Sequence, residues 1–444
     1  MKLSSSHDSM KATLLLLLLP LFFLTSCTDN CERTTTYRKY TSVQLPISDV
    51  RQAVSSGTPQ PLVEPGKLYV KDQYLFIVEI KKGIHIFDNS DPANPKAISF
   101  LSIPGNVDIA VRDNILYADS YIDLVALDIS NPTAIKEVNR VETGFTNGLV
   151  GRTYWSYDKT SMKIYDQREE IATTTVKTDC EGSFNILPYL IPIAWFGRYY
   201  ESLAFADGVY NSSQAPKTTT PTTGVGGSMA RFAISNNQLY VVSSSTLQLF
   251  DITDPAKPTK GKSATLNWNV ETIFPYRNSL FIGTTTGMYI YDVTSPAEPK
   301  QLAAFSHVRS CDPVVVHDNY AYVTLRGTST CGVAGTQDVL DVIDISNLSA
   351  PRVAKTYPLE TPYGLGIDYP TLFVCQGNKG LRVFDASNPL DLKPQQTFAN
   401  VNAFDVIPIS KTLLTIGKDG LYQYDYSNPA NLRLLSKIAA QPAY

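Results

Sequence analysis

The chain has 444 residues, of which 43% are hydrophobic and 18% charged, and its formal net charge is −3 at pH 7. This length and composition are typical of a globular protein with a large core and argue against a disordered chain. The slightly acidic balance, with no Lys/Arg run, excludes the electrostatic footprint of a nucleic-acid-binding protein. Tyr (26), Pro (28) and Gly (25) are abundant, which favours many short strands joined by tight turns.

The N-terminus has the features of a signal peptide. Lys11 precedes an apolar run over residues 14–24, which has the length of a signal-peptide core and is too short to span a bilayer as a mature helix. The run ends in Leu24-Thr-Ser-Cys27, which resembles a bacterial lipobox. Lipoproteins with this motif are cleaved before the cysteine, so residues 1–26 are expected to be removed and Cys27 to carry the anchoring lipid. The alternatives are an ordinary secretory cleavage or an uncleaved anchor.

Export would place the other five cysteines in an oxidising compartment. Cys311 and Cys331 flank one predicted hairpin, so a disulfide across its mouth is expected. Cys375 lies in an apolar strand pattern and is expected to be buried. A disulfide between Cys31 and Cys180 could link the N-terminal arm to a later loop, and this pairing stays open. There is no Cys-x-x-Cys and few histidines remain after cleavage, so neither a metal site nor a cofactor is expected.

One short segment recurs along the chain, as in Val125-Ala-Leu-Asp-Ile-Ser-Asn-Pro132. Its central aspartates are Asp88, Asp128, Asp251, Asp292, Asp344, Asp385 and Asp425. Most neighbours are about forty residues apart, which is the period of four-stranded propeller blades. The aspartate is expected to accept hydrogen bonds from the backbone of a turn, and the proline to end the strand before it. A calcium loop is the alternative, but the prolines replace positions that such a loop needs.

Each unit is predicted to form four strands, in the second unit over residues 107–111, 115–118, 124–129 and 136–141. Seven units predict an all-β fold, a seven-bladed β-propeller over residues 66–440 that closes without a borrowed strand. Residues 142–227 are interpreted as an insertion within the propeller that contains a β-hairpin over residues 153–176. Eight or nine blades are the alternatives, if part or all of this insertion joins the ring.

Residues 27–65 are predicted to form an N-terminal tether and arm. The arm contains a short helical pattern over residues 47–54, for which Ser48 is a candidate cap. Residues 40–45 are expected to add to an otherwise unpaired edge of the propeller.

Two copies of the repeat carry a family resemblance. Leu340-Asp-Val-Ile-Asp-Ile-Ser and Leu124-Val-Ala-Leu-Asp-Ile-Ser are close to the motif that names the LVIVD repeat. The chain resembles the LVIVD-repeat β-propeller lipoproteins of Gram-negative bacteria over residues 66–438. The resemblance implies a propeller fold and export to the cell envelope, with anchoring expected at the outer membrane. It supplies no catalytic motif to transfer residue by residue.

Propeller ligands usually bind at one end of the central channel. Counting back from the second strand of each unit places Asp108, Glu271, Asp312 and Asp405 at one level, with Arg309 nearby. Such a ring could bind a cation or a polyhydroxylated ligand. The alternative is that each carboxylate caps backbone N–H groups or pairs with a neighbouring arginine.

A second candidate surface lies in the insertion, where Trp155, Trp195 and Tyr199 occur in one segment. Flat aromatic faces suit the recognition of sugars or proteins. The alternative is that these rings form the apolar underside by which the insertion packs on the propeller.

No motif of a serine hydrolase, zinc protease, P-loop or dinucleotide-binding enzyme occurs. The sequence therefore predicts a membrane-anchored, extracytoplasmic, non-catalytic binding or protein-interaction module with a glycan or protein partner. The alternative is an envelope enzyme, a glycan hydrolase or lyase, that uses the channel carboxylates as acid and base. A deep pocket with two carboxylates at the separation found in glycosidases would favour the enzyme.

Overall fold

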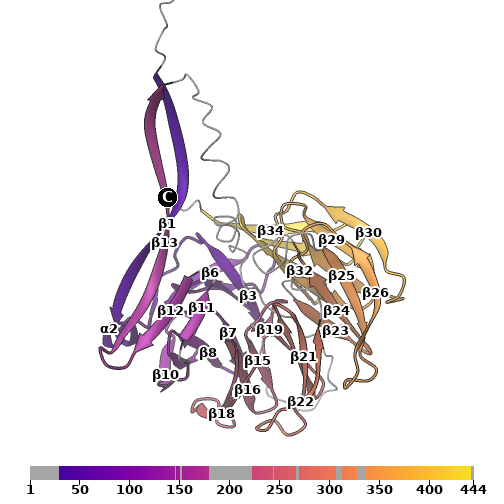
Figure 1. The fold of residues 1–444 in the computed structure, drawn as a ribbon, viewed down its shortest axis with the longest axis horizontal. Helices are drawn as coiled ribbons and strands as arrows, with labels where there is room; N and C mark the ends of the chain where they lie inside the picture. Colours follow the sequence, from indigo (N-terminus) through magenta and orange to yellow (C-terminus); the bar gives the residue numbers. More distant parts are fainter. Residues whose placement is uncertain are drawn as a thin grey trace, which may run out of the picture. The chain divides into compact units, whose positions relative to one another are not determined.

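The computed structural model describes residues 30–145, 147–150, 153–179, 223–243, 245–266, 270–306, 313–327 and 337–441. These residues form eight antiparallel sheets and one short helix (Figure 1). They divide into two compact units, residues 30–41 with 168–179, and residues 42–167 with 223–441. In the part of the chain that the structure describes, no helix is long and apolar enough to cross a membrane.

The smaller unit is a two-stranded ribbon. It is formed by the outer parts of β1 (Asn30–Pro46) and β13 (Lys163–Asp179), which lie side by side in Figure 1. Thr34 and Thr36 hydrogen-bond across the ribbon to Thr175 and Thr173 through their hydroxyl groups, at 3.1 and 3.3 Å. Cross-strand side-chain pairs of this kind stabilise a ribbon that has no third strand.

The larger unit contains seven consecutive sets of four strands, each of which forms one sheet. In chain order the sets are β3 (Pro65–Lys71), β4 (Tyr74–Glu79), β5 (Gly83–Asp88), β6 (Lys96–Ser102); β7 (Ile109–Arg112), β8 (Ile115–Ser120), β9 (Asp123–Asp128), β10 (Lys136–Val141); β15 (Phe232–Ser235), β16 (Gln238–Ser243), β17 (Thr246–Asp251), β18 (Thr259–Thr265); β19 (Val270–Tyr276), β20 (Ser279–Thr284), β21 (Gly287–Asp292), β22 (Lys300–Ser306); β23 (Val314–His317), β24 (Tyr320–Leu325), β25 (Val339–Asp344), β26 (Arg352–Pro358); β27 (Leu365–Asp368), β28 (Thr371–Cys375), β29 (Leu381–Asp385), β30 (Lys393–Phe398); and β31 (Asp405–Ile409), β32 (Thr412–Gly417), β33 (Gly420–Asp425), β34 (Arg433–Ala439). The second set agrees closely with the strands predicted for that unit.

Three further pieces complete the sheets. Two short strands extend the first sheet, β14 (Val225–Gly226) beside β3 and β2 (Ser55–Gly57) beside β6. The eighth sheet has the order β1-β13-β12-β11, in which β11 spans Asn147–Val150 and β12 spans Thr153–Asp158.

The first strands of the seven sets contact one another in chain order, and β31 of the last set contacts β3 of the first. The strand β7 contacts β15 directly, although the eighth sheet lies between them in sequence. Inner strands such as β20 and β28 are buried along their whole length, because sheets pack against both of their faces. Four-stranded sheets packed in this way around their first strands have the architecture of a β-propeller.

The repeated aspartate shapes the turn after each third strand. In all seven sets its Oδ1 accepts the backbone N–H of the residue two positions later, at 2.8–3.0 Å. Hydrogen bonds from that residue hold the pKa of each of these carboxyl groups below its usual range. The turn interpretation of the motif is therefore confirmed at every copy.

The proline of the same turn links neighbouring sheets. Its carbonyl accepts a hydroxyl from the preceding sheet, at 2.6–3.3 Å, in five of the described turns: Ser99 to Pro132, Tyr117 to Pro255, Tyr240 to Pro296, Tyr357 to Pro389 and Ser436 to Pro92. The last of these bonds joins the final set to the first set. One motif thus forms a local turn and also fixes the adjacent sheet.

A hydrogen-bonded pair of side-chain amides also joins the last set to the first. Gln423 in β33 is fully buried, and its side chain exchanges two hydrogen bonds with that of Asn89, at 2.7 and 2.9 Å. The last sheet consists only of β31–β34, so the prediction that it borrows no strand is confirmed.

Two expectations for the N-terminal arm were wrong. Strand β1 pairs with β13, and β2 and β14 extend the first sheet in place of residues 40–45. The helix α2 (Ile47–Gln52) does form, but Pro46 is at its N-cap and Ser48 donates to the neighbouring Asp49 side chain. Ile47 and Val50 are buried, so packing of one apolar face holds this short helix.

We expect Gln423→Leu to lower the free energy of unfolding by about 1–3 kcal/mol, because it leaves the Asn89 amide without its partner. Equilibrium denaturation in urea measures the change. Gln396→Leu is the matched control, because Gln396 is exposed on β30. An equal loss in both variants would show that the amide pair does not stabilise the contact between the last and first sets.

Candidate functional site

Asp108 joins the first strands of three sheets. It precedes β7, and its Oδ2 accepts the backbone N–H groups of Arg231 and Phe232, the latter at 3.0 Å. The same oxygen lies 3.4 Å from Nζ of Lys67 in β3. Asp108 and Lys67 are both buried. Because its acceptor sites are used inside the protein, Asp108 behaves as an internal cap, the alternative that was weighed for the channel carboxylates.

Asp405 begins β31 and is also buried. Its Oδ1 accepts the backbone N–H and the hydroxyl of Ser228, at 2.9 and 2.7 Å, and Ser228 Oγ accepts the N–H of Leu365 at 2.7 Å. Its Oδ2 has no hydrogen-bond partner among the described residues. Burial raises the pKa of Asp405 to about 7, which the nearby Lys67 charge opposes and the Asp108 charge reinforces.

Two glycines make room for the Asp405 carboxyl group. A Cβ on Gly227 would lie 1.9 Å from Oδ2, and a Cβ on Gly364 would lie 2.4 Å from Oδ1. No heavy atom tolerates such distances, so any side chain at either position would displace the carboxyl group. The sequence analysis did not connect these glycines with Asp405, because they lie far from it along the chain.

A further carboxylate, that of the half-buried Asp119 in β8, was not predicted. Its Oδ1 accepts the N–H groups of Val107 and Asp108, at 2.8 and 3.1 Å, and the Asn106 side-chain amide at 2.9 Å. Burial raises its pKa to about 6. The sequence feature that could have identified Asp119 is an acidic residue near the end of an otherwise apolar second strand.

Of the remaining predicted channel residues, only Glu271 is described. Glu271 lies at the register shift between Val270 and Thr272 of β19, where the strand bulges, and it is partly exposed. Arg309 and Asp312 lie outside the described residues. Among the residues that are described, no three His, Cys, Asp or Glu side chains gather as a metal site would require.

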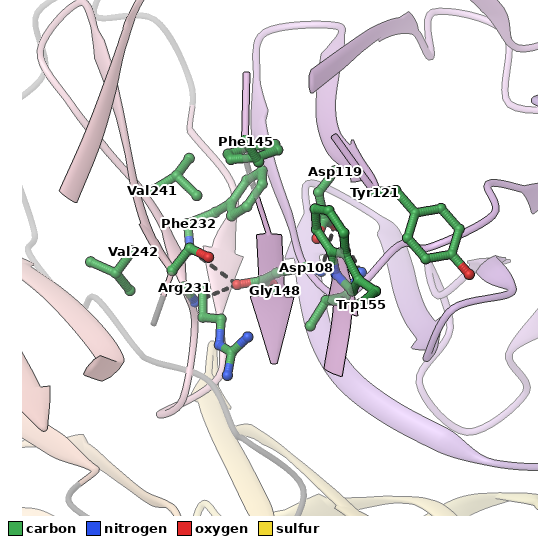
Figure 2. A pocket seen from close by; sticks show the side chains of 12 residues that line it. Asp108, Asp119, Tyr121, Phe145, Gly148, Trp155, Arg231, Phe232, Val241 and Val242 are labelled. Atoms are coloured by element: carbon green, nitrogen blue, oxygen red, sulfur yellow. Dashed lines mark hydrogen bonds between the residues drawn. The ribbon is translucent and has the colours of Figure 1, made fainter. Parts of the chain in front are cut away.

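A cavity of about 30 Å³ lies beside Asp108 and Asp119 (Figure 2). Arg231 also lines it, together with the rings of Tyr121, Phe145, Trp155 and Phe232. This volume holds about one or two water molecules and is too small for a sugar ring. The two carboxylates therefore border a small space and no deep pocket.

Trp155 packs inside the protein. It is 4% exposed and lies edge-on against Tyr121, with ring centroids 5.6 Å apart. Its cross-strand neighbour Gly148 has no side chain, and a Cβ there would lie 2.4 Å from the indole nitrogen. The structure thus places Trp155 as the packing interpretation expects, and the exposed ring on the same strand is Tyr154, at 48%.

Asp166 in β13 holds the eighth sheet to the first two sets. Its Oδ1 lies 2.6 Å from Nζ of Lys81, and its Oδ2 accepts the Tyr121 hydroxyl at 2.8 Å. The segment around Asp166 resembles the repeat in sequence, but here the aspartate is buried and forms no turn of the repeat type. Sequence reasoning missed this role, since both partners are distant in the chain.

Several predicted sites lie outside the described residues, namely Cys27, Trp195, Tyr199, Cys311 and Cys331. The lipid anchor and the disulfide therefore stay predictions. Cys375 is fully buried in β28, as its apolar pattern indicated.

A family model described as the LVIVD repeat matches residues 66–99, 105–143, 226–265 and 332–358. The chain therefore contains LVIVD repeats in these four stretches. The four matched stretches contain the repeat turns at Asp88, Asp128, Asp251 and Asp344. The matched LVIVD repeats therefore correspond to four-stranded sheets of the larger unit.

No curated protein matches the chain significantly. Three solved structures are similar to the chain at low sequence identity. The periplasmic gluconolactonase PpgL of Pseudomonas aeruginosa is 12% identical, with a TM-score of 0.47 and coverage of 84% of this chain and 96% of that one. Sqt1 of Saccharomyces cerevisiae is 11% identical (TM-score 0.47; 88% and 100% covered). BamB of Moraxella catarrhalis is 9% identical (TM-score 0.44; 91% and 88% covered).

We expect Asp405→Asn to flatten the dependence of stability on pH. The raised pKa of Asp405 means that the folded state holds a proton that the unfolded carboxyl group has released. The stabilisation that comes from this bound proton is fully present below about pH 4, and it is lost as the pH rises through about 7. Between pH 6 and 8 the parent protein should lose on the order of 1 kcal/mol more than the variant, measured by urea denaturation at each pH.

The asparagine keeps an oxygen for Ser228 to donate to, so the local hydrogen bonds survive the change. Asp385→Asn is the control, because the pKa of this turn aspartate is lowered and it does not titrate in that range. Equal losses in the parent protein and in Asp405→Asn would contradict the assignment.

Proposed function

We propose that this LVIVD-repeat protein is a lipid-anchored, extracytoplasmic, seven-bladed β-propeller that binds a glycan or protein partner without catalysis. The proposal that the protein is not a catalyst is supported by the internal hydrogen bonds of Asp108 and Asp405. Both carboxylates accept backbone N–H groups from neighbouring sheets and are buried. A group committed in this way is a poor acid or base for a substrate in solution.

The same geometry weakens the proposal of an envelope glycan hydrolase or lyase. Such an enzyme needs two carboxyl groups on either side of a bound glycosidic bond. Asp108 and Asp119 border one cavity, but its volume of about 30 Å³ admits only water. We therefore place the binding surface of the closed protein on its exterior.

The blade count rests on the contacts of the larger unit. The first strands contact one another from β3 to β31 and back to β3, and β7 contacts β15 without a strand between them. The hydroxyl bond from Ser436 to Pro92 repeats, between the last and first sets, the bond that joins other neighbours. These observations support seven blades, with the eighth sheet as an addition.

The anchoring part rests on the sequence. The apolar run followed by Leu24-Thr-Ser-Cys27 favours lipidation at Cys27, and the family resemblance favours the outer membrane of a Gram-negative bacterium. The described part of the protein begins at Asn30 with the strand β1.

We expect Cys27→Ala to move the protein from the membrane fraction to the soluble fraction, because the thiol that would carry the lipid is lost. Fractionation followed by intact-mass measurement of the processed chain tests this. Cys31→Ala, four residues further on, is the matched control and should stay in the membrane fraction. A Cys27→Ala protein of parental mass that remained membrane-bound would rule out this anchor.

Binding is tested with the soluble chain, residues 28–444, in a thermal-shift screen against glycans and divalent cations. A partner that binds the folded state raises the melting temperature in a concentration-dependent way. We expect a glycan to give such a shift without being cleaved. Cleavage that is lost in Asp108→Asn, while the fold is retained, would instead establish an enzyme.

A further inference from the structure

We propose that β11, β12 and residues 163–167 of β13 form a cover over the cavity beside Asp108, Asp119 and Arg231, and that Lys81, Tyr121 and Asp166 form a clasp that holds this cover shut. The inference rests on the proposed function in one respect only, namely that the ligand binds in the cavity once the cover has opened. The opening of the cover is tested on its own.

The cover is a small sheet with one buried and one exposed face. Trp155, Ile164 and Asp166 lie on its underside and are buried, whereas Tyr154 and Tyr165 lie on its outer face and are exposed. None of its strands belongs to the seven consecutive sets. It is therefore an addition to the larger unit that could move without breaking any sheet of those sets.

The clasp is built from equivalent positions of two repeats. Lys81 lies in the turn between β4 and β5, and Tyr121 lies in the corresponding turn between β8 and β9. Both residues have positive φ, 64° and 51°, a conformation that non-glycine residues rarely adopt. Their side chains converge on the two oxygens of Asp166, at 2.6 and 2.8 Å.

The space beneath the cover is bordered by both polar and apolar groups. Asp119 is among its lining residues, and Trp155 of the cover meets Tyr121 of the clasp at its edge (Figure 2). Opening would let water or ligand hydroxyl groups reach the Asp119 carboxylate, which offsets part of the cost of exposing Trp155. A carboxylate beside aromatic rings suits a polyhydroxylated ligand.

The test is hydrogen exchange of the full chain, followed by mass spectrometry, for the parent protein and Asp166→Asn. The variant removes the charge that holds Lys81 while preserving the shape of the side chain. We expect amides of residues 147–150 and 153–167 to exchange at least about tenfold faster, a change of about 1.4 kcal/mol in the opening equilibrium. Strands β7–β10 and β15–β18 should keep their parental protection.

Two further variants make the outcome specific. Tyr121→Phe removes only the hydroxyl group of the clasp and should speed exchange in the same residues. Asp158→Asn changes an aspartate of the same sheet that caps its own turn, and it should leave exchange unchanged. Unchanged exchange of the cover in both clasp variants, or an equal rise across all sheets, would overturn the proposal.

The glycan screen repeated on Asp166→Asn separates this inference from the proposed function. A glycan that binds the open form should bind the variant more tightly, because less free energy is spent on opening. If the cover opens in the exchange experiment and no glycan binds either protein, the cover stands and the glycan proposal fails.

Discussion

The turn after each third strand is the interaction on which the larger unit depends. Its aspartate accepts a backbone N–H two residues later in all seven sets, so the chain reverses at the same point of each sheet. In five of the described turns the carbonyl of the proline also accepts a hydroxyl group from the preceding sheet. Each of these hydrogen bonds contributes only about 1 kcal/mol to the free energy of unfolding, but similar bonds recur in one sheet after another.

The centre of the protein shows a second use of carboxylates. Strands that begin beside one another leave backbone N–H groups that no neighbouring strand pairs, and such groups are costly when buried. Asp108 accepts those of the third set, and Asp405 accepts that of Ser228. Lys67 adds a compensating positive charge next to Asp108. Two carboxylates of the predicted ligand ring, Asp108 and Asp405, therefore satisfy the backbone where the sheets meet.

The inserted segment follows different rules from the repeats. Its aspartate at position 166 stands where a repeat would form a turn, yet the strand continues through it as part of β13. Asp166 instead binds two turns of neighbouring sets. Residues Gly148 and Trp155 of the insertion thus line the cavity, while the first strands of the seven sets keep their own contacts.

Much of the fold could be predicted from the sequence. The period of about forty residues, the Asp…Pro turns and the apolar runs are local features, and local hydrogen bonds and strand alternation determine them within a few residues. The four strands of the second set and the seven turn aspartates were predicted for this reason. The tertiary structure decided the rest, because each decisive partner is remote. Asp108 meets Arg231 across 123 residues, Asp405 meets Ser228 across 177, and Lys81 meets Asp166 across 85. The sequence around a carboxylate is the same whether the group faces a ligand or accepts hydrogen bonds from a buried backbone. Its role depends on backbone N–H groups of other sheets, and only the packing of those sheets places them next to the carboxylate.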